Sequence, residues 1–154
     1  MELYDWLVLA HVLAAIVWVG GGIMQTVSSR RISAVGDDAA RRAFADIEEW
    51  SGTRIFGPAA ATVLVLGFLM VWQSDAWSFG QAWVWLSVIL AAAAMVVGAA
   101  FYGPEGARIG ALTAERGPDD PEVKRRVARV ATINSIEVAV MVVIVFLMVF
   151  KPGV

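Results

Sequence analysis

The chain has 154 residues, of which 59% are hydrophobic and 17% charged, a balance that excludes disorder, collagen-like repeats and an ordinary soluble enzyme. It contains no cysteine, so disulfide frameworks, thiolate zinc sites, iron–sulfur clusters and cysteine nucleophiles are excluded together. The formal net charge of -2 provides no basic field, and we expect no nucleic-acid partner.

Four apolar segments each approach the roughly 20 residues that a helix needs to cross the hydrocarbon of a bilayer. They span residues 4–25, 55–72, 82–101 and 133–150. None of them alternates between polar and apolar residues, so a β-barrel is excluded and each segment must satisfy its backbone as a helix. The sequence therefore predicts an all-α membrane protein with four transmembrane helices in an antiparallel bundle, built as a single domain over residues 1–154.

The positions of the basic residues predict the orientation of this bundle. Eleven of the 12 Lys and Arg residues lie in the connections 26–54 and 102–132, and the remaining one is Lys151. Because basic residues near the ends of spans are retained in the cytoplasm, we expect both connections inside and both termini outside a bacterial inner membrane. Tryptophans gather near the opposite, outer interface, as an aromatic belt does: Trp6, Trp72, Trp77, Trp83 and Trp85.

The two long connections also contain helix signals. In the first, Asp37 and Asp38 can cap a helix over 38–50 whose apolar residues recur at helical spacing, as in a segment lying on the membrane surface. In the other, residues 105–116 favour a helix, Gly117-Pro118 ends it, and Asp120-Pro121 starts a helix that runs into the fourth span. A solvated, charged linker with helical character is the alternative for each.

Polar and sulfur-bearing side chains inside the spans follow two helical stripes, which we expect to face the bundle interior. Small residues on the first stripe would let a neighbouring helix approach closely. The stripe on the first span contains His11, Ala14, Ala15, Trp18, Gly22 and Gln25, and the stripe on the fourth contains Asn134, Glu137, Met141 and Met148.

The outer half of the bundle holds the first candidate site. Counting about 1.5 Å per residue, His11 lies about 10 Å below the outer boundary, and Met70 and Met148 lie within a few ångströms of the same level. One imidazole with thioether sulfurs suits a haem b with axial His and Met, or Cu(I), which prefers soft ligands. The alternative is structural, with methionines filling gaps in the core and His11 hydrogen-bonded to a neighbour.

The inner half holds a separate polar layer, about 14 Å from His11 along the membrane normal, so one metal ion cannot hold both His11 and Glu137. Glu137 can be level with Gln25 and Arg54. We expect an Arg54–Glu137 ion pair, with Gln25 and Asn134 as hydrogen-bond partners, that locks the helices and neutralises a costly carboxylate. The alternatives are a proton-handling carboxylate, or an anion clamp in which Arg54 holds a propionate or a lipid phosphate.

Motifs along the whole chain carry a family resemblance. They are the His-to-Trp-Gly-Gly-Gly first span over 11–22, GTRIFGP at 52–58, WSFG at 77–80, GPE at 103–105 and ERGPDDP at 115–121. In this combination the chain resembles an uncharacterised family of bacterial predicted integral membrane proteins. More distantly, its first span is similar to those of the copper-resistance D and HemJ-type four-helix membrane proteins.

The distant resemblance implies a histidine-bearing first helix near a cofactor or metal, and His11 is the position that corresponds. With one histidine in the chain, bis-His haem ligation within one protomer is excluded, and a catalytic role is not indicated. Two other functions remain open besides a haem or metal site. The first is a non-catalytic subunit that packs against partner helices or further copies of itself in the bilayer, and the second is a small oligomeric transporter.

Overall fold

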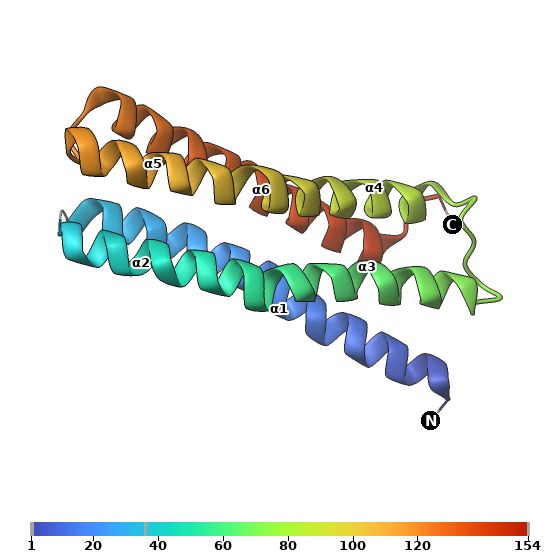
Figure 1. Ribbon diagram of the computed structural model, residues 1–154. Coiled ribbons are helices and arrows are strands. Elements are labelled where there is room, and N and C mark those ends of the chain that lie inside the picture. Colours follow the sequence, from blue (N-terminus) through green and yellow to red (C-terminus); the bar gives the residue numbers. More distant parts are fainter. Residues whose placement is uncertain (1, 36, 154) are drawn as a thin grey trace.

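The computed structural model describes residues 2–35 and 37–153, and in that part of the chain every regular element is a helix (Figure 1). In chain order the elements are α1 (Leu3–Val35), α2 (Asp38–Ser51), η1 (Gly52–Phe56), α3 (Gly57–Trp72), α4 (Ala82–Val97), η2 (Gly98–Tyr102), α5 (Gly103–Arg116) and α6 (Pro121–Phe150). The two η elements are short π-helices.

These elements join into four long rods, each of which is long and apolar enough to cross a membrane. The rods are α1, α2–η1–α3, α4–η2–α5 and α6, and the chain passes back and forth along the bundle from one to the next (Figure 1). The predicted all-helical fold with four potential spans is confirmed for the described residues. The N-terminus, the α3–α4 connection and the C-terminus lie at one end, here called the termini end, and the other two connections lie at the connection end.

The helices extend well beyond the apolar segments, and this changes the interpretation of the first connection. The segment predicted to lie on the membrane surface forms α2, and its backbone continues without interruption through η1 into α3. In Figure 1, α2 and α3 follow one gently curved axis rather than turning across the bundle. The surface-helix prediction is therefore wrong, because the junction with the span remains helical.

Each π-helix occurs at the same short motif, Gly-x-x-x-aromatic-Gly-Pro, at residues 52–58 and 98–104. Proline has no amide hydrogen, and its ring clashes with the carbonyl four residues earlier in a regular helix. In the first motif the helix widens by one residue per turn before the proline, so that the Gly57 amide donates to the Gly52 carbonyl five residues back. The two motifs place Phe56 and Tyr102 at matching points, where a span joins its extension.

The predicted caps at Asp37 and Asp120 and the predicted break at Gly117 are confirmed. Asp37 caps α2 by accepting hydrogen bonds from the Ala39 and Ala40 amides at 2.8 and 3.4 Å. Gly117 ends α5 with a φ of 85°, a left-handed conformation that favours glycine. Asp120 then caps α6 by accepting from the Glu122 amide at 2.8 Å.

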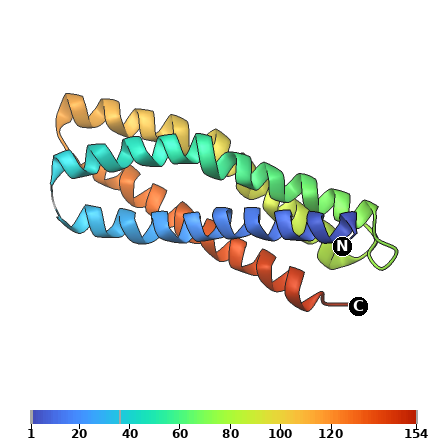
Figure 2. The ribbon, with the colours of Figure 1, turned by 90° about the horizontal axis from the view of Figure 1, so that it is seen from below.

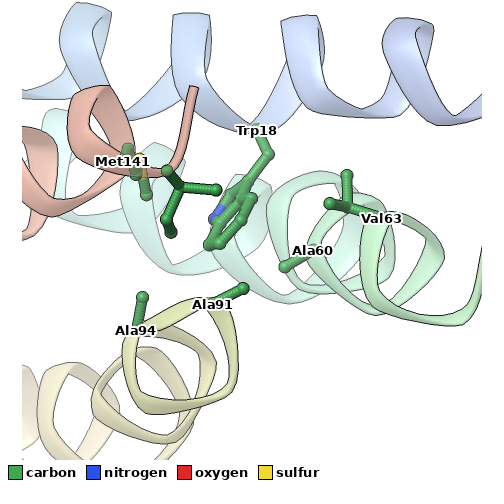
Figure 3. Close-up of a cluster of buried hydrophobic side chains, with 7 residues drawn as sticks. Trp18, Ala60, Val63, Ala91, Ala94 and Met141 are labelled. Carbon is green, nitrogen blue, oxygen red and sulfur yellow. The ribbon is translucent and has the colours of Figure 1, made fainter. Parts of the chain in front are cut away.

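The four rods pack around a small core in the middle of the bundle. Helix α1 packs most closely on α3, α4 packs on α6, and α6 also crosses α1 (Figure 2). In Figure 3 the Trp18 indole projects from α1 between the small residues Ala60 of α3 and Ala91 of α4. Trp18 is only 6% exposed, as expected for the inward stripe of the first span. Small residues on the facing helices thus make room for one large aromatic side chain.

Two glycines allow this close approach of α1. A Cβ atom at Gly21 would lie 2.1 Å from Phe56 Cε1, and one at Gly22 would lie 3.2 Å from Met141 Sδ. A Cβ atom at the neighbouring Gly20 would meet no atom within 4 Å. The Gly-Gly-Gly sequence therefore has two packing positions and one open position.

Candidate functional site

His11 lies on α1 against the face of α3. Its imidazole is half-buried beside the backbone of Val63, and a Cβ atom at Gly67 would lie 3.3 Å from His11 Cε1. The ring therefore occupies the space that the glycine leaves open. Its Nδ1 atom is buried and forms no well-aligned hydrogen bond among the described residues. A buried imidazole nitrogen without a partner is uncommon, because the loss of hydration is not offset.

The two methionines of the predicted outer layer are half-buried on separate helices. Met70 follows Gly67 by one helical turn on α3, and Met148 packs at the edge of the core from α6. Within the described residues, no three His, Cys, Asp or Glu side chains are grouped closely enough to hold a metal ion. A second ligand beside His11 would therefore be of another kind, and the sequence suggests the thioether sulfur of Met70 or Met148.

Glu137, the acidic residue of the predicted inner layer, has a partner that the sequence did not indicate. The Tyr102 hydroxyl donates to Glu137 Oε2 at 2.6 Å, linking the end of η2 to α6. Arg54 is exposed on η1, and the described residues contain no ion pair between it and Glu137. The predicted Arg54–Glu137 pair is not formed, and Arg54 is exposed whereas Glu137 is half-buried.

The other two residues of that layer lie half-buried on different helices. Asn134 lies on α6 one turn before Glu137, whereas Gln25 on α1 lines a pocket together with Ser28 and Glu48. Glu48 also lies within electrostatic range of Tyr102. The polar side chains at this level thus form two adjoining sites, Tyr102 with Glu137 and the pocket that contains Glu48.

Sequence reasoning missed Glu48 and Tyr102 for different reasons. Glu48 lies in a segment rich in charge, where nothing in the sequence separates one inward carboxylate from its exposed neighbours Asp46 and Glu49. Tyr102 was counted with the connection because it follows the apolar segment. The repeated Gly-x-x-x-aromatic-Gly-Pro motif was the available signal, since it marks both places where an aromatic residue enters this layer.

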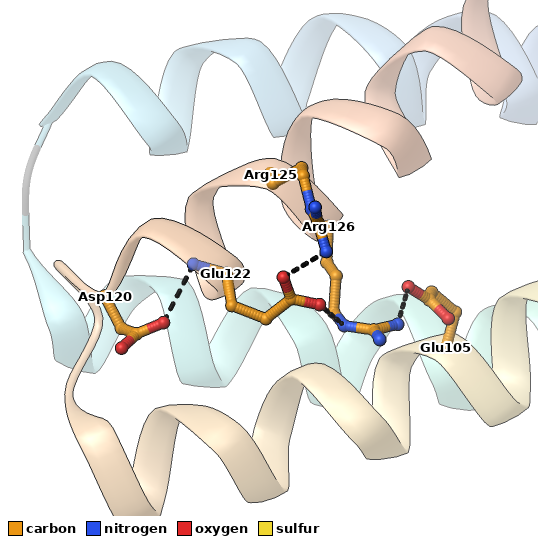
Figure 4. Close-up of polar contacts among 5 residues, drawn as sticks. All are labelled: Glu105, Asp120, Glu122, Arg125 and Arg126. Carbon is orange, nitrogen blue, oxygen red and sulfur yellow. Dashed lines mark hydrogen bonds and ion pairs between the residues drawn. The ribbon is translucent and has the colours of Figure 1, made fainter.

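A second polar network lies farther along, between α5 and α6 (Figure 4). Arg126 Nη1 lies 2.7 Å from Glu105 Oε1, and Arg126 Nε lies 2.8 Å from Glu122 Oε1. Arg125 also pairs with Glu122, and Glu105 is only 7% exposed. The guanidinium therefore bridges two helices and stabilises the α5–α6 hairpin beyond the apolar spans.

The turn of that hairpin carries one more ion pair, on the surface. Lys124 Nζ lies 2.8 Å from Asp119 Oδ1, and its hydrogen bond holds the pKa of the Asp119 carboxyl below its usual value. Both side chains are largely exposed, so the pair contributes little to stability. The connection end therefore has charged side chains both in its interior, at Glu105 and Arg126, and on its surface, at Asp119 and Lys124.

A comparison with protein families connects this arrangement to a known group. The family described as "Predicted integral membrane protein (DUF2269)" matches residues 5–152, which is nearly the whole chain. The chain belongs to this family. Its members are described as integral membrane proteins, in agreement with the four long apolar helices. No curated protein and no solved structure matches the chain.

The family match confirms one part of the resemblance noted from the sequence. It supports the uncharacterised membrane family, and with it a lipid environment for the four apolar helices. It does not support the distant similarity to the copper-resistance D and HemJ-type proteins. The function of the family is not assigned, so membership alone indicates no chemistry for this chain.

Proposed function

We propose that this protein is a multi-pass protein of the bacterial inner membrane, with both termini outside, that binds a haem or a soft metal ion through His11. The observation that supports the site is the buried His11 Nδ1 atom, which forms no well-aligned hydrogen bond among the described residues, although the Val63 backbone lies beside the ring. An imidazole nitrogen with an unused lone pair is a ligand for iron or copper. Met70 and Met148 are the candidate second ligands.

Two experiments test this site. Protein purified gently from its native membrane should show a Soret band if it holds haem, or copper by elemental analysis if it holds Cu(I). His11→Ala should abolish either signal, whereas Met24→Leu, at a methionine that is 66% exposed, should change neither. Met70→Leu and Met148→Leu would identify the sulfur ligand. Wild-type protein without haem or metal, and unchanged by His11→Ala, would refute the proposal.

The proposed orientation rests on the basic residues at the connection end. A single cysteine placed at Ser78 or Ala114, both exposed, tests it directly. An impermeant thiol reagent should label the Ser78 position in intact cells and the Ala114 position only after lysis. Labelling of Ala114 in intact cells would reverse the assignment.

A non-catalytic assembly subunit is the second candidate, and one observation favours it. Along η2 and α5, a Cβ atom added at Gly98, Gly103, Gly106 or Gly110 would meet no atom within 4 Å. Exposed glycines within a helix cost stability unless a partner uses the space for close approach. If this function is correct, the protein should co-purify with a partner or a second copy, and Gly106→Leu should disrupt that association without unfolding the bundle.

A further inference from the structure

The pocket that contains Glu48 lies between α1, α2 and η1 and has a volume of about 240 Å³. It is separate from His11, which lies toward the other end of α1. The pocket lies near η1, which joins the apolar helix α3 to the charged helix α2. It is at the level of the Tyr102–Glu137 hydrogen bond. A ligand in this pocket would therefore sit near the boundary between the apolar and the charged parts of the bundle.

Among the described residues that line the pocket, Glu48 is the one with a charge. Helix α1 contributes the uncharged Gln25 and Ser28 to the wall, and η1 contributes Phe56. Tyr102 of η2 and, beyond it, Glu137 of α6 are the nearby titratable groups, and neither carboxylate forms an ion pair in the described part of the chain. A half-buried carboxylate without a counter-ion favours a ligand that brings positive charge.

The walls of the pocket restrict the chemistry of that cation. Phe44 and Phe56 provide aromatic surface from α2 and η1, and Met24 and Ile47 form an apolar rim that is 66% and 60% exposed. A strongly hydrated metal ion requires six or more oxygen ligands, which such a wall does not offer. An ammonium ion with apolar substituents can instead pair with the carboxylate and contact the aromatic rings.

We propose that this pocket binds a hydrophobic monovalent ammonium ion, with Glu48 as its counter-ion and Phe44 and Phe56 as its aromatic walls. The exposed apolar rim lets the ligand enter from the region of the lipid headgroups. A proton and the ammonium ion compete for the same carboxylate, because protonated Glu48 has no charge to offer. Binding therefore weakens as the pH falls.

Benzyltrimethylammonium is a suitable probe, and its binding to the full chain in detergent micelles can be followed by titration calorimetry. We expect saturable binding that weakens about tenfold or more in Glu48→Gln, which keeps the shape of the side chain and removes its charge. Glu49→Gln, at the exposed neighbouring carboxylate, is the matched control and should bind as the wild type does. No saturable binding to the wild type, or equal binding by Glu48→Gln, would overturn the proposal.

A second variant tests the same pocket independently, in case Glu48→Gln does not fold. Ser28→Leu fills the pocket and leaves Glu48 intact, so it should also abolish binding, and undiminished binding would contradict the proposed location. Burial raises the pKa of the Glu48 carboxyl to about 7, so affinity should fall from about pH 8 to about pH 5 in the wild type. A pH-independent affinity would exclude Glu48 as the counter-ion. His11→Ala should leave binding unchanged, which separates this proposal from the haem or metal site.

The natural ammonium could belong to a soluble compound or to a lipid headgroup such as phosphatidylethanolamine. Reconstitution in nanodiscs of digalactosyldiacylglycerol alone, whose neutral headgroup contains no ammonium group, or with added phosphatidylethanolamine, distinguishes these sources. Weaker binding of the probe in the second nanodiscs would identify the lipid as the competitor. Equal binding in both would indicate a soluble ammonium compound as the ligand of the same pocket.

Discussion

Gly21→Ala adds one methyl group where α1 packs against Phe56 of η1. The new Cβ atom would lie 2.1 Å from Phe56 Cε1 and 2.6 Å from Phe56 Cζ. Ordinary carbon contacts begin at about 3.5 Å, so the ring or the helix would have to move by about 1.4 Å. Phe56 packs against the buried core, and its ring cannot withdraw without losing those contacts.

Gly20→Ala isolates the cost of this clash, because Gly20 is exposed in the same helix turn and a Cβ atom there meets nothing. Alanine is favoured over glycine within a helix by about 1 kcal/mol, and that gain is common to both variants. Overpacking of a filled site costs about 1–3 kcal/mol. We therefore expect the free energy of unfolding of Gly21→Ala to be about 1–3 kcal/mol below that of Gly20→Ala.

Unfolding of both variants in mixed micelles, followed by far-ultraviolet circular dichroism, measures this difference. Phe56→Leu in the Gly21→Ala background should recover part of the loss, since a smaller side chain relieves the contact. Equal stability of Gly20→Ala and Gly21→Ala would refute the reasoning. That result would mean that α1 and η1 do not approach as closely as the structure indicates.

Three further predictions concern contacts of polar side chains, two between helices and one between the two loops at the termini end. Tyr102→Phe and Glu137→Ala should show a coupling of about 1–3 kcal/mol in a double-mutant cycle of unfolding, because each removes the same hydrogen bond. Glu105→Gln should lower the free energy of unfolding by about 1–3 kcal/mol, since the Arg126 guanidinium loses a nearly buried partner. Lys151→Ala should lower it by only about 0.5–1 kcal/mol, because it removes a cation–π contact near the surface.

The first two of these predictions have controls in the chain. Arg54→Ala combined with Glu137→Ala should give additive losses, because the two side chains are not paired, and additive losses for Tyr102 and Glu137 would contradict their hydrogen bond. Glu115→Gln, on the exposed part of α5, should change stability by less than about 0.5 kcal/mol. A loss as large as that of Glu105→Gln would show that burial of the ion pair has no special effect.

The sequence was sufficient for the all-helical architecture and for the inward face of α1. Uninterrupted apolar runs leave a helix as the only way to satisfy the backbone in hydrocarbon, whatever the neighbouring segments do. The caps at Asp37 and Asp120 and the break at Gly117 are likewise local, because each depends on the chemistry of a few adjacent residues. Trp18 was placed on the inward stripe by helical spacing alone.

The partners of the polar side chains were decided only by the tertiary structure. Counting residues places Glu137 and Arg54 at the same depth, but depth does not fix the rotation of a helix about its axis, and rotation decides which side chains meet. The π-helix that ends at Tyr102 changes that rotation locally and brings its hydroxyl to Glu137. In the same way, Glu48 lines a pocket while Glu49 is exposed, because packing of α2 on α1 separates two neighbours that the sequence leaves equivalent.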